Sequence, residues 1–273
     1  MMNIREQVFG PQGYSSDLRL SDHELSVFRE LVSAQWLAVI ATAQPSLSDE
    51  ARRLGIANYH LLAPKLDHRR LWPKSSRLLS RTAVSRIRAL PFLDTLEQAF
   101  GQFSISDIYD THQHHGEEEI YWRLVRPGCD TDVGPIHADK WFHAGFNDGR
   151  GMFSDAVQTV KIWIPLYCQP GRSGLAIAAG SHLKSWRFRI ESVDGQPRPV
   201  PDDDFSACEP ELIATEPGQM LVFNEGTLHR GVVNDGSETR VSAEITMVMP
   251  RHGQMAAQVR PTTPNEFQNG RNT

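Results

Sequence analysis

Two histidines and one aspartate have the types and spacing of a metal site. His137 and Asp139 are separated by one residue, and His229 lies far downstream. Residues two apart in an extended segment project to the same side, so His137 and Asp139 can bind one metal ion together. Two histidines with one carboxylate are the ligand set of mononuclear iron(II) centres that leave coordination positions open. These residues therefore predict oxygen activation and oxidation of a C–H bond. Taken alone, His137 has a simpler alternative, a hydrogen-bonded loop histidine.

A second pair, Arg240 and Ser242, predicts an anion site near the first. They are again two residues apart, at the start of an apolar run that has the character of a strand, so their side chains share a face. A guanidinium can hold a carboxylate through two hydrogen bonds, and a hydroxyl can add a third. A buried arginine needs an anion, which a keto acid would supply. The alternative is an internal salt bridge, for which Glu244 on the same face is the obvious partner.

The residues before about 118 have helical patterns. Ser21 and Glu24 form a capping-box sequence, because each side chain can satisfy an amide at a helix start. Apolar residues at helical spacing extend this helix to about Ile40. A second helical pattern covers residues 82–100 and is interrupted by Pro91. These patterns predict a helical N-terminal layer, which we expect to cover the mouth of the domain that follows.

The residues after 118 have strand patterns separated by turn signals such as Pro-Gly and Asn-Asp-Gly. The predicted strands are residues 119–126, 158–166, 220–223 and 241–249. Short strands with such turns are typical of an all-β sandwich or barrel. The sequence therefore predicts a mainly β fold with a helical N-terminal layer.

Two further cations, Arg123 and Lys161, lie on the predicted strands. Each alternates with apolar neighbours, so each points either into a barrel or away from it. If they point inward, Arg123 and Lys161 are candidates for binding an anionic substrate or cosubstrate.

Two ordered motifs resemble a known family. The segment PGQMLVFNEGTLH (217–229) and the segment GSH (180–182), which follows WIPL (163–166), are similar to signature stretches of the phytanoyl-CoA-hydroxylase-like oxygenases. Ala179 stands where that family often has proline, a departure that bears only on the shape of the turn. His182 is expected to have a structural role in this turn.

The resemblance implies a double-stranded β-helix, or jelly-roll, core and dependence on iron(II) and 2-oxoglutarate. It implies that His137, Asp139 and His229 bind the iron, and that Arg240 with Ser242 binds the distal carboxylate of 2-oxoglutarate. Halogenating members of the family have a small residue in place of the metal-binding carboxylate. The presence of Asp139 therefore favours hydroxylation or a related oxidation.

The resemblance covers about residues 119–250. From the length of the chain and its patterns we expect a single oxygenase domain over 1–273, with a mostly helical part at 1–117, the jelly-roll core at 118–250 and a tail at 251–273.

The composition limits the partners and the compartment. A formal net charge of −5 argues against a nucleic-acid partner, which normally meets a basic surface. The sequence has no run of 18 or more apolar residues of the kind that crosses a membrane. Three scattered cysteines form neither a disulfide framework nor a C-x-x-C metal motif. We expect a cytoplasmic enzyme that acts on a small molecule and dioxygen.

Two other functions remain open at this stage. A cupin-like metal enzyme that does not use 2-oxoglutarate would need the same three ligands but would leave Arg240 unexplained. A non-catalytic binding module with a degenerate site is the other, and the intact set of three ligands argues against it.

Overall fold

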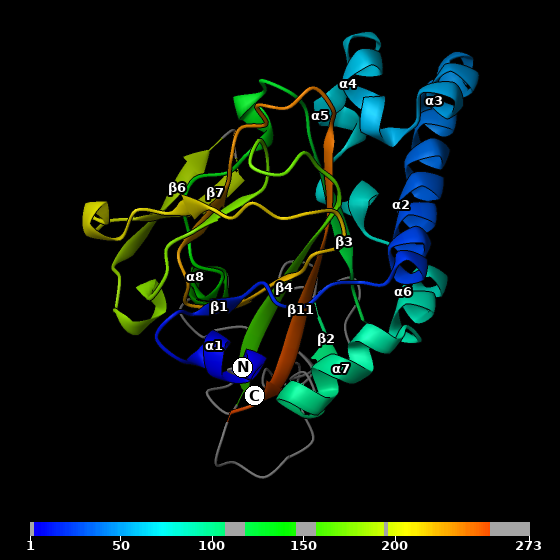
Figure 1. The fold of residues 1–273 in the computed structure, drawn as a ribbon. Helices are drawn as coiled ribbons and strands as arrows, with labels where there is room; N and C mark the ends of the chain where they lie inside the picture. Colours follow the sequence, from blue (N-terminus) through cyan, green and yellow to red (C-terminus); the bar gives the residue numbers. More distant parts are fainter. Residues whose placement is uncertain (1–2, 107–117, 146–156, 194–195, 252–273) are drawn as a thin grey trace, which may run out of the picture.

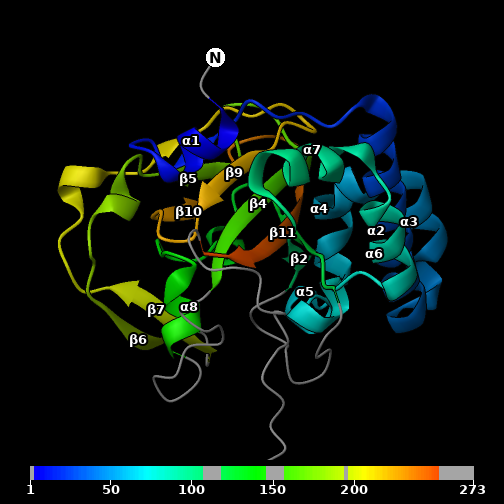
Figure 2. The same ribbon diagram turned by 90° about the horizontal axis from the view of Figure 1, so that it is seen from below.

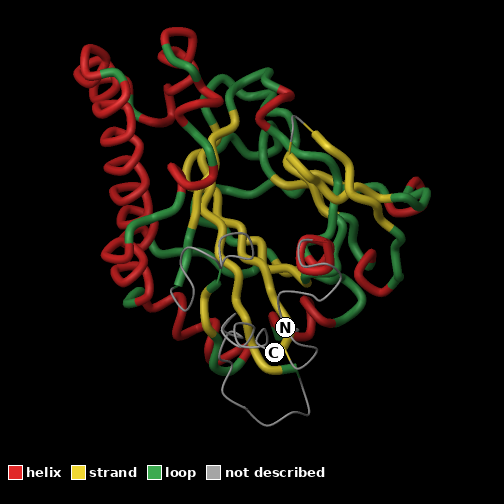
Figure 3. The backbone as a smooth tube through the Cα atoms, turned by 180° about the vertical axis from the view of Figure 1, so that it is seen from behind, coloured by secondary structure: helices red, strands yellow, loops and turns green. Residues whose placement is uncertain are grey.

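A computed structural model describes residues 3–106, 118–145, 157–193 and 196–251 of the chain. The predicted tail therefore lies outside the described residues, except for Arg251. Most helices gather on one side of a large antiparallel sheet, and a smaller sheet, a hairpin and two short helices lie on its other side (Figures 1 and 2). The tube in Figure 3 shows the same separation of helices from strands from behind.

The longest helix, α2 (Asp22–Ala43), begins where the capping box predicts. Ser21 Oγ accepts a hydrogen bond from Glu24 N at 3.3 Å, and Glu24 Oε2 accepts one from Ser21 N at 2.7 Å. The second predicted helix is two helices, α6 (Arg81–Arg88) and α7 (Pro91–Phe100). Pro91 is the first residue of α7, and Leu90 before it is extended, as proline requires of its predecessor.

The remaining helical segments are short. They are α1 (Ile4–Phe9), α3 (Ser48–Leu54), α4 (Tyr59–Leu62), α5 (His68–Leu71), α8 (Lys140–Gly145) and the 3-10 turns η1 (Pro45–Leu47), η2 (Ile56–Asn58), η3 (Ala63–Lys65), η4 (Lys74–Arg77), η5 (Asp130–Asp132), η6 (Ser181–Leu183) and η7 (Ser206–Cys208).

The large sheet has the strand order β1-β9-β4-β11-β2, and β3 also pairs with β11. The small sheet has the order β10-β5-β8, and β6 and β7 form a hairpin. All these pairings are antiparallel. The strands are β1 (Tyr14–Ser15), β2 (Ser104–Ile105), β3 (Tyr121–Val125), β4 (Val157–Tyr167), β5 (Leu175–Ile177), β6 (Phe188–Val193), β7 (Gln196–Pro201), β8 (Glu211–Leu212), β9 (Leu221–Asn224), β10 (His229–Gly231) and β11 (Arg240–Pro250).

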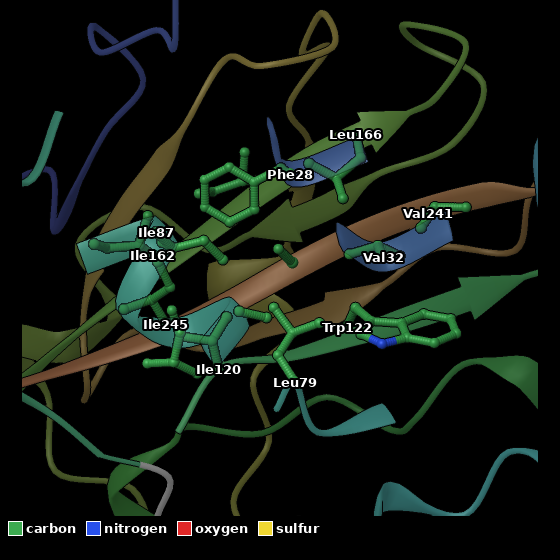
Figure 4. Close-up of a cluster of buried hydrophobic side chains, with 14 of the residues drawn as sticks. Phe28, Val32, Leu79, Ile87, Ile120, Trp122, Ile162, Leu166, Val241 and Ile245 are labelled. Atoms are coloured by element: carbon green, nitrogen blue, oxygen red, sulfur yellow. The ribbon is translucent and has the colours of Figure 1, made fainter. Parts of the chain in front are cut away.

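Each face of the large sheet has its own packing partner. On the outer face, Trp122, Ile162 and Ile245 belong to one buried cluster with residues of α2 and α6 (Figure 4). On the inner face, Trp163 and Phe223 pack with Ile177 of the small sheet. Two facing antiparallel sheets with one face covered by helices are the predicted double-stranded β-helix with a helical layer, and this prediction is confirmed.

The helices cover the outer face of the large sheet, because their apolar stripes match the apolar alternate residues of β3, β4 and β11. That they also cover the mouth of the barrel stays a prediction. Among the described segments, α2 alone has the length and mean hydropathy, 1.2, of a membrane span. Its residues Phe28, Val32 and Ile40 are 0% exposed in the shared core, so this helix is a core element of the fold.

Candidate metal centre

The three predicted metal ligands meet between the two sheets. The backbones of His137 and His229 pair by two hydrogen bonds, of 3.0 Å from His137 N and 2.9 Å from His229 N. Asp139 Oδ1 lies 3.7 Å from His137 Nε2 and 3.8 Å from His229 Nε2. One potential ligand atom from each residue lies within 4.8 Å of the others. Within the described ranges, no other group of His, Cys, Asp or Glu side chains meets this criterion.

The hydrogen bonds of the two imidazoles determine which nitrogen faces the centre. His137 Nδ1 lies 2.8 Å from Pro135 O, and His229 Nδ1 lies 3.0 Å from Thr227 O. A backbone carbonyl only accepts, so each Nδ1 carries the proton and each Nε2 presents a lone pair toward Asp139. Metal-binding histidines are commonly oriented by such a bond from the other ring nitrogen.

The surroundings keep His137 neutral, as metal binding requires. Burial, with a further contribution from His229, lowers the pKa of His137 to about 4, although Asp139 opposes the shift. The rings are held by aromatic contacts. The ring centres of His229 and Phe223 are 4.6 Å apart, and those of His137 and Phe142 are 5.2 Å apart.

A buried ion pair fixes the loop that carries His137. Arg126, just after β3, donates to both carboxylate oxygens of Asp132, at 2.7 and 2.9 Å, and its backbone N–H donates to Oδ2 at 2.8 Å. His68 Nε2 lies 3.5 Å from the same carboxylate, whose side chain is 2% exposed. The sequence analysis did not identify this pair, since an Arg and an Asp six residues apart carry no recognisable signal.

Arg240 lies at one end of the inner face and has no internal carboxylate partner among the described residues. Its Nη1 donates to Gly174 O at 2.6 Å, and its guanidinium carbon lies 5.6 Å from the centre of the Trp163 ring. Burial lowers the pKa of Arg240 to about 10. Its Nε and the hydroxyl of Ser242 are buried without a hydrogen-bond partner. These two groups share one face of β11, so a carboxylate placed between them would satisfy both.

The alternative explanation of Arg240, a salt bridge to Glu244, is wrong. Glu244 Oε1 instead accepts a hydrogen bond of 2.6 Å from Arg123 Nε. The reason is register, because Arg123 on β3 lies opposite Ser242 and can extend along β11 to the next inner residue.

Arg123 and Lys161 both point to the inner face. Arg123 Nη2 also donates to the Tyr121 hydroxyl at 3.3 Å. Lys161, opposite Thr246 on β11, donates to the Thr246 hydroxyl at 3.0 Å. His182 lies in η6, outside the group of three ligands, and a Cβ at Gly13 would meet its Nδ1 at 2.4 Å. The ring of His182 thus packs closely on Gly13, in keeping with a structural role.

No protein-family model matches the chain, and no curated protein matches it. Solved structures do match. The chain is similar to the non-heme monooxygenase ThoJ in its apo form, with a TM-score of 0.54 and 14% identity over 90% of this chain and 79% of ThoJ. It is similar to EvdMO1, with a TM-score of 0.52 and 16% identity over 90% of this chain and 50% of that one. AviO1 from Streptomyces viridochromogenes Tue57 matches with a TM-score of 0.50 and 15% identity, over 90% and 94%. At these identities the likeness establishes the fold.

Proposed function

We propose that the protein is an iron(II)- and 2-oxoglutarate-dependent oxygenase of the phytanoyl-CoA-hydroxylase-like kind, which oxidises a C–H bond of a small molecule. One observation carries the proposal: His137, Asp139 and His229 converge beside Phe223, and the face of the large sheet that carries Phe223 also holds Arg240 and Ser242 with unsatisfied polar atoms. A metal site alone would fit many enzymes. A metal site beside an unpaired, buried guanidinium fits one that binds a dicarboxylate.

The donor set fits iron(II). Two neutral imidazole nitrogens and one carboxylate leave coordination positions for a bidentate keto acid and dioxygen. Bound iron, 2-oxoglutarate and dioxygen would supply the oxidation of a substrate C–H bond, with 2-oxoglutarate converted to succinate and carbon dioxide. The carbonyls of Pro135 and Thr227 keep both imidazoles in the tautomer that can bind the metal.

Arg240 and Ser242 position the cosubstrate. The guanidinium Nε and the Ser242 hydroxyl, which is 0% exposed, would donate to the distal carboxylate. Gly174 O holds the guanidinium through Nη1 and so fixes its direction. The Trp163 ring beside it excludes water and strengthens each charge-assisted hydrogen bond.

We further propose that residues 1–273 form a single oxygenase domain in the cytoplasm. One buried cluster contains residues of α2, α6 and α7 together with residues of β3, β4 and β11, and this supports a single folding unit. The free thiols of Cys129, Cys168 and Cys208 are in keeping with a reducing compartment.

The proposal is tested by anaerobic titration of the apoprotein with iron(II) and 2-oxoglutarate. We expect a weak visible metal-to-ligand charge-transfer band that is lost in Arg240→Ala. Arg172→Ala is the matched control, because Arg172 is exposed and its ion pair with Asp235 lies on the surface. Bound iron with no band on addition of 2-oxoglutarate would contradict the proposal and favour a cupin-like metal enzyme.

A further inference from the structure

A segment near the start of the chain, residues 11–15, lies against the loop that leads into His229. This loop joins β9 to β10, and His229 is the first residue of β10. Strand β1, at the end of the segment, pairs with β9. Gly13, just before β1, is buried. The N-terminal part of the chain is thereby joined to the support of a metal ligand.

The carbonyl of Gly13 makes the main contact. It accepts a hydrogen bond of 3.0 Å from Asn224 N and one of 3.1 Å from the Thr227 hydroxyl. A backbone carbonyl has two lone pairs, so it can accept both bonds at once. The Thr227 side chain is completely buried, and its hydroxyl is therefore directed to the N-terminal segment without competition from solvent.

Thr227 also contacts the metal ligand. Its carbonyl lies 3.0 Å from His229 Nδ1 and accepts the proton of that nitrogen, while its N–H donates to Asn224 O at 2.9 Å. The N–H, the hydroxyl and the carbonyl of one residue are thus all engaged. With the first two held, the direction of the carbonyl is fixed. That direction favours the His229 tautomer in which Nε2 is free to bind a metal.

The backbone at Gly13 is itself held in place. Gly13 has a φ of +82°, a conformation that favours glycine. A Cβ at this position would lie 3.0 Å from Thr227 Oγ1. The neighbouring Gln12 O accepts a hydrogen bond of 3.0 Å from Gly180 N, which belongs to the turn before η6. The segment is therefore fixed at the point where its carbonyl meets Thr227.

A second contact from the same segment reaches His229. Tyr14 lies opposite Phe223 in the pairing of β1 with β9 and packs against the buried cluster that contains Phe223. The ring centres of Phe223 and His229 are 4.6 Å apart. Residues 13 and 14 thus support the ligand by a hydrogen-bonded route and by a packed route.

We propose that residues 11–15 are a positioning element of the metal centre, in which Gly13 O and the Thr227 hydroxyl together hold His229 in its metal-binding tautomer. This inference rests on the proposed function, since it concerns the orientation of one ligand of the proposed iron. Thr227 is a positioning residue, because it touches the ligand and not the metal. The competing explanation is that the bond only fastens the segment to the fold, in which case its removal would leave His229 unchanged.

Two variants of Thr227 separate these explanations. Thr227→Val keeps the shape of the side chain but cannot donate, and Gly13 O keeps its other hydrogen bond, so the fold should be retained. Thr227→Ser keeps the hydroxyl. Arg5→Met is the matched control, because Arg5 Nη1 donates to Phe100 O at 3.1 Å and fastens the N-terminal part of the chain to α7 instead of to the loop before His229.

The first readout is nitrogen-15 NMR of the histidine rings in metal-free protein, with the His229 signals identified by their absence from His229→Ala. We expect one tautomer, with the proton on Nδ1, in the wild type, Thr227→Ser and Arg5→Met, and a mixture of tautomers in Thr227→Val. The second readout is manganese(II) affinity by calorimetry. It should fall about 10-fold in Thr227→Val and stay within about 2-fold of the wild type in the other two variants.

A single Nδ1–H tautomer in folded Thr227→Val, or a manganese(II) affinity equal to that of the wild type, overturns the proposal. An equal loss of affinity in Arg5→Met also overturns it. If Thr227→Val does not fold, hydrogen exchange of the wild type decides. Because coupling between two sites is reciprocal, manganese(II) should slow amide exchange in residues 11–15, and unchanged exchange there overturns the proposal. The expected tautomers without a charge-transfer band on addition of iron(II) and 2-oxoglutarate would contradict only the proposed function.

Discussion

Arg123 Nε donates a hydrogen bond of 2.6 Å to Glu244 Oε1 across the pairing of β3 with β11. This hydrogen bond engages the Glu244 carboxylate, which Arg240 on the same strand would otherwise approach. The inner face therefore holds one internally paired arginine and one arginine whose Nε is buried without a partner. We therefore expect opposite effects on stability from replacing Glu244, the partner of the paired arginine, and from replacing Arg240.

Replacing Glu244 should destabilise the protein and flatten its acid sensitivity. Burial raises the pKa of Glu244, but the charges of Arg123 and Lys161 outweigh it and hold the pKa at about 2, below the ordinary 4.5. Such a carboxylate stabilises the fold above pH 4.5, and this contribution is lost as the pH falls through about 2. Glu244→Gln should lower the free energy of unfolding at pH 7 by about 3 kcal/mol. Urea unfolding over a pH series measures both effects.

The control for this prediction is Asp49→Asn, at a side chain that is 95% exposed and paired with exposed Arg52. It should change the unfolding free energy by less than about 0.5 kcal/mol. A Glu244→Gln protein as stable as the wild type at pH 7 would show that the Arg123 pair contributes nothing.

Replacing Arg240 should have the opposite effect in the absence of ligand. Its guanidinium is buried with one carbonyl contact and no described carboxylate, so Arg240→Met removes a desolvated charge and fills the same volume. We expect an unchanged or higher Tm without ligand. With manganese(II) and 2-oxoglutarate at 100 times its Kd, the wild type should gain about 2.7 kcal/mol and the variant should not. Anaerobic thermal unfolding with and without ligand measures this, and an equal ligand-induced rise in both proteins would contradict it.

Much of the fold was predictable because the deciding interactions are local or periodic. The Ser21 and Glu24 capping box acts over three residues, and Pro91 excludes a continuous helix by its own geometry. Strand β4 alternates apolar residues toward the helices with Lys161 and Trp163 toward the small sheet. The spacing of His137 and Asp139 likewise predicts that their side chains project to the same side.

Other features depend on contacts that the sequence does not encode locally. Strands β5, β8 and β10 have 3, 2 and 3 residues, which is too short for any periodicity to be recognised. Whether Glu244 would pair with Arg123 or Arg240 depended on the register of β3 on β11. The position of the helical layer depended on which face of the large sheet its apolar stripe meets.

Removing one histidine ligand should weaken metal binding strongly, whereas removing His182 should not. His229→Ala leaves His137 and Asp139 as the ligands, and we expect manganese(II) affinity to fall by about 100-fold or more. His182→Ala is the control, because His182 lies close by in η6 but outside the three-ligand group. Calorimetry of each apoprotein with manganese(II) measures the affinities. An equal loss in both variants would show that the effect is general disruption and not loss of a ligand.

The Arg126–Asp132 pair should influence the metal centre without touching it. Asp132 receives three hydrogen bonds from Arg126 and lies in η5, a few residues before His137. Because its carboxylate is buried and charged, Asp132→Ala leaves the Arg126 guanidinium unpaired and should cost about 3 kcal/mol of unfolding free energy. The loop would then hold His137 less rigidly, and we expect manganese(II) to bind about 10-fold more weakly.

Asp130→Ala, at an exposed position in the same turn, should change neither the unfolding free energy nor the manganese(II) affinity. Calorimetry at a temperature where both variants are fully folded separates the two effects. Unchanged metal affinity in folded Asp132→Ala would show that η5 stabilises the fold without positioning His137.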